Sequence, residues 1–206
     1  MHPNLILTLP QRLIYFLDSG NAQQAASFLI CDKELGAVMV NTPDFSTKLL
    51  SQIECHQINY IFLPSHLGAR DLDLWQKETN AEIIAHQAEC PYIPQKVDHA
   101  INEKTRLSRT IDFLPLPGRT PGSCALYLKN LPGVLFPGPV LQSTPGNWPT
   151  ITQHEDDFNF ESRLFSALLL KDTKFQYVFT DDFQPGHLHG PNADQHIRRN
   201  IDQLFD

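Results

Sequence analysis

The stretch Leu114–Val140, LPLPGRTPGSCALYLKNLPGVLFPGPV, constrains the fold of this chain more than any other segment. Its turns are marked by residues that fix φ or tolerate positive φ: Pro117, Gly118, Pro121 and Gly122. Leu126 and Leu128 alternate with more polar neighbours, which is the period-two pattern of a half-buried strand. The stretch therefore predicts short strands joined by tight turns, near residues 111–115, 123–129 and 133–137.

The residues before this stretch predict strands interrupted by helices. Short apolar runs bounded by turn residues predict the strands: Asn4–Leu9, Arg12–Leu17, Ala25–Cys31, Gly36–Asn41, Tyr60–Leu63 and Glu82–His86. A turn is expected at Asp18–Ala22, and a single helical turn at His86–Cys90. Helical spacing predicts one helix over Phe45–Gln52 with Asp44 as its N-cap, and a second from Asp71 that ends at Asn80.

The second half repeats this organisation. Pro91–Arg109 is polar and weakly periodic, so we expect it to cross between the halves with a short strand near Leu107. The remaining elements follow in order: a loop over Leu141–Asp157, a helix over Glu161–Leu170 with a buried stripe of Leu164, Phe165, Leu168 and Leu169, a strand over Gln176–Thr180, and a closing helix over Ala193–Phe205. We predict one domain over residues 1–206, with two comparable halves at about 1–108 and 109–206.

Composition excludes several classes of partner. The 206 residues include 16 Lys and Arg against 23 Asp and Glu, a formal charge of −7, and no basic run occurs. Nucleic acid and anionic membranes are therefore not expected partners. No apolar run reaches the length of a membrane helix, and no signal-peptide pattern is evident. The dispersed cysteines predict small buried side chains in a reducing compartment, so we expect a cytoplasmic protein: Cys31, Cys55, Cys90 and Cys124.

Three loops after predicted strands hold most of the chemically useful side chains. Ligands gather at such loops in α/β proteins. The loop at 64–71 contains His66, Arg70 and Asp71. The turn at 118–123 has Arg119 at its centre, and the loop at 185–190 carries an HxH pair. His187 and His189 of that pair face the same side if the segment is extended.

These loops, in this order, resemble the metallo-β-lactamase superfamily over nearly the whole chain. The matching segments are GAVMVNTP, IFLPSHLGARDLDLWQKETNAEIIAH, LPGRTPGSCALYL, GVLFPGPVL and FTDDFQPGHLHG. The resemblance implies an α/β (α+β) fold built as a four-layer αββα sandwich, with its site where both sheets end. It also implies hydrolysis by water activated on one or two Zn²⁺ ions.

The chain departs from the family pattern at the metal ligands. The family's first loop carries HxHxDH, and its four ligand places hold His66, Gly68, Arg70 and Asp71 here. Arg119 replaces the histidine of GHTPGS, and Pro139 replaces the bridging aspartate. His187 matches the last ligand. A guanidinium keeps its proton and adds positive charge where a cation would bind, so the dinuclear zinc site is expected to be lost.

Two functions follow from these departures. The first is a non-catalytic protein that binds a small anionic molecule, with Arg70 and Arg119 replacing the charge of the metals. In a simpler interpretation of the same substitution, Arg119 fills the vacated volume and pairs with Asp71 or another acid. The alternative function is a hydrolase of esters, amides or phosphoesters with one metal, zinc or iron, on His66, Asp71 and His187, with His189 as a possible addition. Whether the chain is an enzyme stays open at this point.

Overall fold

A computed structural model describes the chain except for residues 1–2, 19–22, 144–145 and 206. The first sheet has seven strands in the order β1-β2-β3-β4-β5-β6-β7. Strands β1 to β4 pair antiparallel, and β4 to β7 pair parallel. The strands are β1 (Pro3–Leu9), β2 (Arg12–Leu17), β3 (Ser27–Asp32), β4 (Gly36–Val40), β5 (Ile58–Leu63), β6 (Glu82–His86) and β7 (His99–Ile101).

The second sheet has five strands in the order β12-β11-β10-β9-β8. Its strands pair antiparallel, except that β12 runs parallel to β11. They are β8 (Thr105–Ser108), β9 (Ile111–Pro115), β10 (Cys124–Leu128), β11 (Val134–Phe136) and β12 (Tyr177–Val178). The strands predicted from the Leu114–Val140 stretch are thus confirmed.

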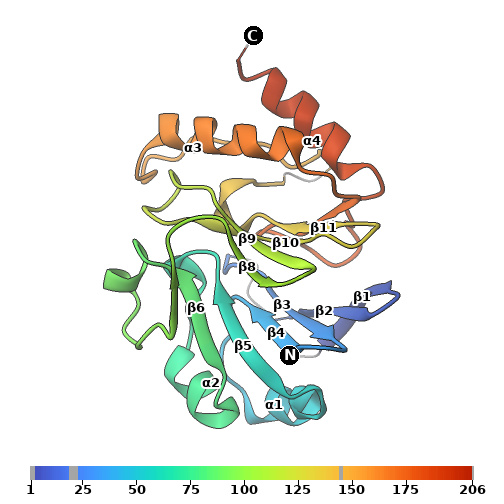
Figure 1. Ribbon diagram of the computed structural model, residues 1–206, viewed down its shortest axis with the longest axis vertical. Helices are drawn as coiled ribbons and strands as arrows, with labels where there is room; N and C mark the ends of the chain where they lie inside the picture. Colours follow the sequence, from blue (N-terminus) through green and yellow to red (C-terminus); the bar gives the residue numbers. More distant parts are fainter. Residues whose placement is uncertain (1–2, 19–22, 144–145, 206) are drawn as a thin grey trace.

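The two sheets pack face to face, and helices cover both outer faces (Figure 1). Helices α1 (Thr47–Ile53) and α2 (Leu72–Thr79) lie on the first sheet, and α3 (Phe160–Ala167) and α4 (Ala193–Asp202) on the second. The core between the sheets is rich in stacked and edge-on aromatic rings, which bury large apolar areas. Separate buried clusters lie under each helical layer. The predicted αββα sandwich is confirmed.

Both ends of helix α2 were predicted correctly from the local sequence. It follows Asp71, whose φ is +43°, and it ends at Asn80 in the left-handed conformation. Trp75 is fully buried, and its indole Nε1 donates to the Pro43 carbonyl at 2.8 Å. An aromatic ring with a satisfied polar atom can be buried at little cost. The helix is thereby anchored to the loop after β4.

Some predicted details were wrong or shifted. The N-cap of α1 is Ser46, whose side chain accepts from Leu49 N, and not Asp44. In the predicted stripe of the 161–170 helix, Phe165 and Leu169 are 65% and 58% exposed. Phe165 lies within α3, whose buried residues are Arg163 and Ala167. Leu169 lies in the 3₁₀ helix Leu168–Asp172, where the period is 3.0 and no longer 3.6. The turn at Asp18–Ala22 lies mostly outside the described residues.

The segment between the halves is more regular than expected. Pro91–Arg109 contains β8, as predicted near Leu107, and also β7, which was not predicted. The helical turn expected at His86–Cys90 lies slightly later, as a 3₁₀ helix over Cys90–Tyr92. Short strands carry too few residues for a clear period, so such shifts are expected. Among the described residues, no helix combines the length and apolarity needed to cross a bilayer.

The turn around Gly118 offers a direct test of the packing between the second sheet and α3. Gly118 has φ +133°, and a Cβ there would clash with the backbone N and Cα of Arg163. We expect Gly118→Ala to lower the free energy of unfolding by at least about 3 kcal/mol, because backbone strain and a backbone clash add. Urea unfolding followed by circular dichroism measures it.

Gly186 provides the matched control. It also has positive φ, +91°, but a Cβ there would meet nothing within 4 Å. Gly186→Ala is expected to cost only about 1 kcal/mol. Equal losses in the two variants would show that α3 does not pack against this turn as described.

Candidate functional site

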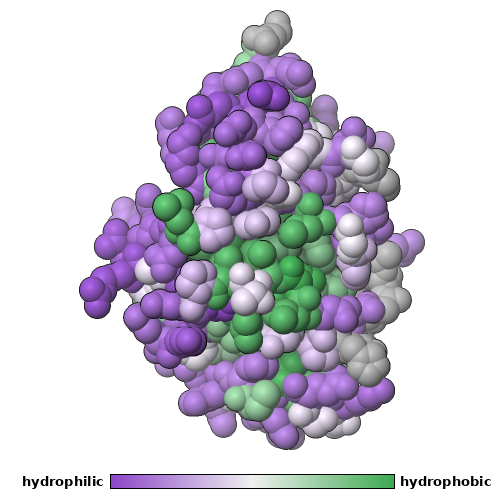
Figure 2. Space-filling view, turned by 90° about the vertical axis from the view of Figure 1, so that its right-hand side faces the viewer, coloured by the Kyte–Doolittle hydropathy of each residue, from purple (hydrophilic) through white to green (hydrophobic). Residues whose placement is uncertain are grey.

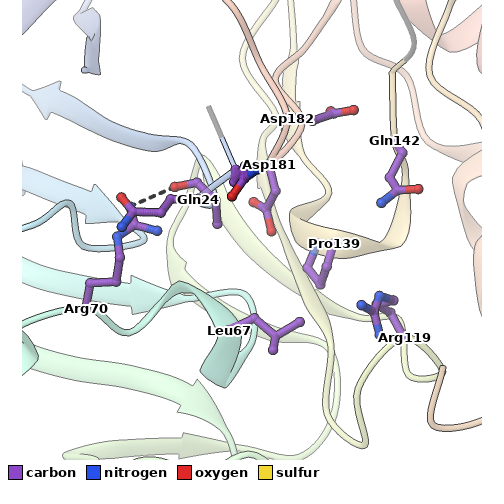
Figure 3. A pocket seen from close by; sticks show the side chains of 10 residues that line it. Gln24, Leu67, Arg70, Arg119, Pro139, Gln142, Asp181 and Asp182 are labelled. Atoms are coloured by element: carbon purple, nitrogen blue, oxygen red, sulfur yellow. Dashed lines mark hydrogen bonds between the residues drawn. The ribbon is translucent and has the colours of Figure 1, made fainter. Parts of the chain in front are cut away.

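A cavity of about 410 Å³ opens where loops from both sheets meet (Figure 3). Every loop that lines it precedes β3 or follows a strand, as expected for a site along the sheet ends. Figure 3 shows Arg70 and Gln24 at one end, Arg119 at the other, and Leu67, Pro139 and Asp181 between them. The lining residues are Gln23, Gln24, Ala25, Leu67, Arg70, Arg119, Pro139, Gln142, Asp181 and Asp182.

Arg70 is held mainly by neutral acceptors. Its Nη2 donates to the Ala25 carbonyl at 2.8 Å and to Ser27 Oγ at 3.0 Å. Its Nε lies 3.6 Å from a carboxylate oxygen of Asp44. Burial lowers the pKa of the Arg70 guanidinium, and nearby carboxylates oppose that shift. Arg70 therefore fixes the segment before β3 against the loop after β5.

Asp181 lies in the middle of the cavity wall and is bound to buried neighbours. Asn41 Nδ2 donates to its Oδ1 at 2.9 Å and to the Ala26 carbonyl at 2.9 Å. The backbone carbonyl of Asp181 accepts from Ala26 N at 2.6 Å. Burial raises the pKa of Asp181 to about 7, although the Asn41 hydrogen bond lowers it. The carboxyl therefore titrates near neutral pH.

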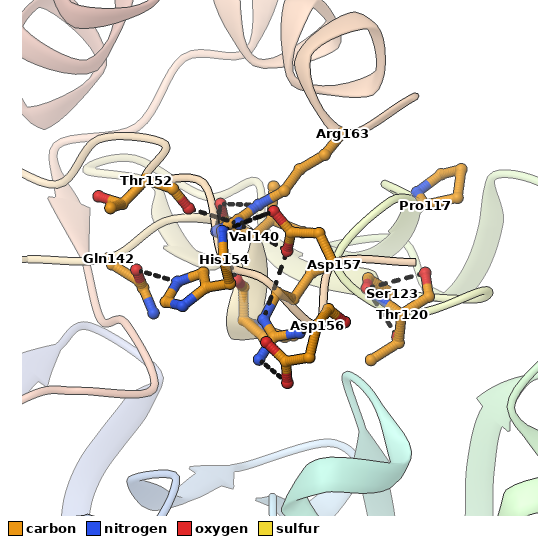
Figure 4. Close-up of polar contacts among 12 residues, drawn as sticks. Pro117, Thr120, Ser123, Val140, Gln142, Thr152, His154, Asp156, Asp157 and Arg163 are labelled. Carbon is orange, nitrogen blue, oxygen red and sulfur yellow. Dashed lines mark hydrogen bonds and ion pairs between the residues drawn. The ribbon is translucent and has the colours of Figure 1, made fainter. Parts of the chain in front are cut away.

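Arg119 pairs with acids of the 141–157 loop (Figure 4). Its Nη2 donates to Asp156 Oδ2 at 2.9 Å, and its Nη1 to the Asp156 carbonyl at 3.1 Å. Its Nε lies 3.6 Å from Asp157 Oδ1. The hydrogen bond from Arg119 lowers the pKa of Asp156. The expected pairing of Arg119 with an acid is confirmed, and its partners are Asp156 and Asp157, not Asp71.

Arg163, which was not predicted as a site residue, binds the same Asp157 that lies beside Arg119. Its guanidinium is fully buried, and its Nη1 donates to Asp157 Oδ1 at 3.0 Å and to the Thr152 carbonyl at 2.8 Å. Its Nη2 donates to the carbonyls of Pro139 and Val140 at 3.0 and 2.8 Å. Burial lowers the pKa of Arg163, and Asp157 opposes the shift. Asp157 thus links two guanidiniums.

His66 lies beside a buried carboxylate that was also not anticipated. Glu89 is fully buried, and its Oε2 accepts from His66 N at 2.8 Å and lies 2.5 Å from His66 Nδ1. Its Oε1 accepts from Gly122 N at 2.6 Å. Tyr92 stacks on the imidazole at 4.8 Å. Glu89 therefore joins the 64–71 loop to the Gly118–Ser123 turn. In the sequence, it stood out only as an acidic residue just after a predicted strand.

The other predicted site residues lie outside the cavity lining. The Asp71 carboxylate accepts from Phe45 N at 2.8 Å and so closes the loop before α1. His187 is exposed in a turn whose backbone bonds to Gln184. His189 is partly buried, its Nε2 lies 3.0 Å from the Asn147 carbonyl, and burial lowers its pKa. The structure thus brings together Arg70 and Arg119 in one cavity, but not the histidines.

Comparison with known proteins decides the fold. No family model and no curated protein matches the chain. Solved structures do match. DIM-1 metallo-β-lactamase aligns with a TM-score of 0.72 at 10% identity, over 99% of each chain. The chain adopts the metallo-β-lactamase fold.

Two further structures agree with this. VMB-1 aligns with a TM-score of 0.74 at 13% identity, over 100% of this chain and 99% of that chain. BJP-1, a subclass B3 metallo-β-lactamase of Bradyrhizobium japonicum, gives 0.64 at 18% identity, over 97% and 91%. The metallo-β-lactamase fold expected from the loop motifs is therefore confirmed over the full length.

The side chains present do not fit the zinc pair of that fold. Within the described part of the chain, no group of three or more His, Cys, Asp or Glu side chains is placed to hold a metal ion. The Asp71 carboxylate accepts from Phe45 N, and the contact of His66 Nδ1 with Glu89 leaves Nε2 as the ring nitrogen that could bind a metal. Arg119 and Pro139 contribute no ligand atom for zinc. Among the positions where the resemblance places ligands, the side chains of His66, Arg70, Asp71 and Arg119 bond within the protein, whereas His187 is exposed.

The Glu89 contacts predict a large loss of stability when its carboxylate is removed. Glu89→Ala would leave the N–H groups of His66 and Gly122 without their acceptor in a buried setting. We expect the free energy of unfolding to fall by about 3 kcal/mol. Urea unfolding tests this, with the exposed Glu103→Ala as control, expected within about 0.5 kcal/mol of wild type. Equal effects would show that Glu89 does not join the two loops.

The raised pKa of Asp181 predicts a pH-dependent gain in Asp181→Asn. The unfolded carboxyl ionises near pH 4, and the folded one near 7. Ionisation therefore opposes folding as the pH rises through this window. Asparagine keeps the Oδ1 acceptor for Asn41 and cannot ionise. From about pH 4 to about pH 8, its free energy of unfolding relative to wild type should rise by up to about 4 kcal/mol. A difference that does not vary with pH in urea unfolding would contradict the buried position.

Proposed function

We propose that this protein binds a small polar ligand with an anionic group in the 410 Å³ cavity, and that it does so without a dinuclear zinc centre. The single observation that supports this most is that the two arginines at former ligand positions, Arg70 and Arg119, line one cavity of ligand size. The fold is that of metallo-hydrolases, but the described residues include no group of three metal-binding side chains, and this motivates the binding function in place of metal-assisted hydrolysis.

Arg119 is the proposed anchor for the anionic group. A guanidinium has five N–H donors, and among the described residues two hydrogen bonds of Arg119 go to Asp156. Its side chain is 12% exposed, so the remaining donors face a partly desolvated space. Carboxylates and phosphates match the planar fork of arginine. A ligand oxygen can therefore join Asp156 at this guanidinium.

The rest of the cavity lining favours a ligand that is not only anionic. Asp181 presents a carboxyl, and Gln24 and Gln142 present amides. Within the described residues, Gln24 Oε1 is buried and has no hydrogen-bond partner, and Arg70 Nε has only an Asp44 carboxylate oxygen at 3.6 Å. Buried polar atoms without partners are costly, and a ligand or a water molecule that satisfies them is stabilised there. Hydroxyl or ammonium groups on the ligand would suit Asp181 and Gln24.

The one-metal hydrolase receives less support. Its three ligands would be His66, Asp71 and His187. The Asp71 carboxylate already accepts from Phe45 N, and no group of three metal-binding side chains is found among the described residues. His187 lies on the exposed 185–190 loop and outside the cavity lining. No specific contact among the described residues favours this second function.

Binding of simple probes tests the proposal. Inorganic phosphate, succinate and glutamate would be titrated into wild type by calorimetry, with thermal unfolding as a second readout. We expect at least one probe to bind, and Arg119→Ala to weaken it about tenfold or more, since a charged hydrogen-bonded pair is lost. Arg119→Lys should give an intermediate affinity.

The matched control is Arg199→Ala, an exposed arginine of α4 far from the lining residues in sequence. It should bind the probe as wild type does. The proposal is wrong if none of the probes binds wild type, or if Arg119→Ala, shown to be folded, binds the same probe with unchanged affinity.

A further inference from the structure

Seven of the ten residues that line the cavity of about 410 Å³ have charged or polar side chains. Figure 2, by contrast, shows a hydrophobic patch on the side of the molecule on which Figure 1 places β1, and all ten lining residues lie outside that strand. The charged lining residues are two arginines, Arg70 and Arg119, and two aspartates, Asp181 and Asp182. A buried charge needs a partner of opposite sign, so the charge that a ligand must bring depends on which of these four already have one.

Both arginines of the cavity have acidic partners within the protein. Arg119 Nη2 donates to Asp156 Oδ2 at 2.9 Å, and Arg70 Nε lies 3.6 Å from Asp44 Oδ1. The Asp156 side chain is 72% exposed, so its contact with Arg119 is open to solvent and can be shared with a ligand oxygen. Each guanidinium therefore has a carboxylate of its own before any ligand binds.

The two aspartates form no ion pair with Lys, Arg or His in the part of the chain that the structure describes. The ion pairs of both cavity arginines go to other acids. Asp181 Oδ1 accepts from Asn41 Nδ2 at 2.9 Å. Asp182 accepts from Ser143 N at 2.8 Å and from Ser143 Oγ at 3.0 Å. These donors are neutral, so the negative charge of the two carboxylates is left uncompensated.

Asp181 is the better placed of the two aspartates to meet a ligand. Figure 3 shows its carboxyl in the space between Arg70 and Arg119. Its Oδ2 accepts no hydrogen bond from a described residue, whereas both carboxylate oxygens of Asp182 accept from Ser143. Gln24 Oε1, in the same lining, is buried and also lacks a donor among the described residues. The cavity thus presents acceptor oxygens and a negative charge to a group that can supply both N–H donors and positive charge.

We propose that the cavity is selective for a zwitterion, a small ligand whose anionic group binds Arg119 and whose ammonium group binds Asp181. This inference rests on the proposed function, because it takes Arg119 as the anchor of the anionic group. An ammonium group has three N–H donors and a full positive charge, so it satisfies the oxygens of Asp181 and Gln24 and also compensates the carboxylate. A hydroxyl group would donate to the same oxygens but would leave the charge without a partner.

The ionisation of Asp181 gives this selectivity a second observable consequence. Burial and the nearby charge of Asp182 raise the pKa of Asp181 to about 7, against the Asn41 hydrogen bond and the charge of Arg70. An ammonium group beside the carboxyl favours its ionised form and therefore lowers that pKa. At pH 7, where the free carboxyl is about half protonated, binding of a zwitterion should release up to about half a proton per ligand.

Calorimetry of the full chain at pH 8 with three four-carbon dicarboxylates tests the selectivity. Aspartate carries an ammonium group on this skeleton, malate a hydroxyl group, and succinate neither. We expect aspartate to bind about tenfold or more tightly than malate and succinate, because only its ammonium group compensates Asp181. Arg119→Ala should weaken the binding of all three, as the proposed function requires.

Asp181→Asn assigns the effect to one carboxyl. The variant keeps the Oδ1 acceptor for Asn41 but carries no charge, so aspartate should lose its advantage and bind within about twofold of succinate. Asp172→Asn, at an exposed position, is the matched control and should keep the advantage. At pH 7, the heat of aspartate binding should depend on the ionisation enthalpy of the buffer in wild type and not in Asp181→Asn.

The outcomes separate this inference from the proposed function. If the three ligands bind wild type equally and through Arg119, the zwitterion inference is wrong and the proposed function stands. An advantage of aspartate that persists in Asp181→Asn, shown by circular dichroism to be folded, also overturns the inference. If no ligand binds wild type, both fail.

Discussion

The buried guanidinium of Arg163 is the constraint on which the Arg119 end of the cavity depends. A charge without solvent must have acceptors for its donors, because an unpaired buried ion is strongly destabilising. Arg163 finds them in the carbonyls of Pro139, Val140 and Thr152 and in Asp157. These contacts hold the corner after β11 and the 141–157 loop together. Through Asp157 they also orient Arg119, which has replaced a histidine of the family motif.

Glu89 likewise holds the 64–71 loop of the first sheet in place. Its buried carboxylate accepts hydrogen bonds from the 64–71 loop and from the Gly118–Ser123 turn, and so connects the two sheets. Two buried charges, Arg163 and Glu89, thus stand behind the positions where the resemblance places metal ligands. Both residues hold loops of the two sheets together by hydrogen bonds and ion pairs within the protein. These contacts fix the walls of the cavity between Arg70 and Arg119.

The fold could be predicted from sequence largely because its signals are local. Apolar runs predicted most of the strands, Gly and Pro residues predicted the turns of the 114–140 stretch, and Asn80 predicted the end of α2. The partners of Arg119 lie far along the chain, and no local pattern distinguishes Asp157 from a solvated acid. The burial of Arg163 and Glu89 was missed for the same reason, since both depend on acceptors and donors from distant segments. The predicted helix stripe was wrong at Phe165 because α3 buries Arg163 and Ala167 instead, and at Leu169 because the helix changes to 3₁₀ geometry there.

The proposed function requires that the positions where the resemblance places metal ligands form no zinc site. Elemental analysis of wild type after incubation with excess Zn²⁺ and desalting tests this most directly. We expect zinc well below one equivalent per chain, with no change in His66→Ala or His187→Ala. One or two equivalents of zinc in wild type that disappear in either variant would contradict it.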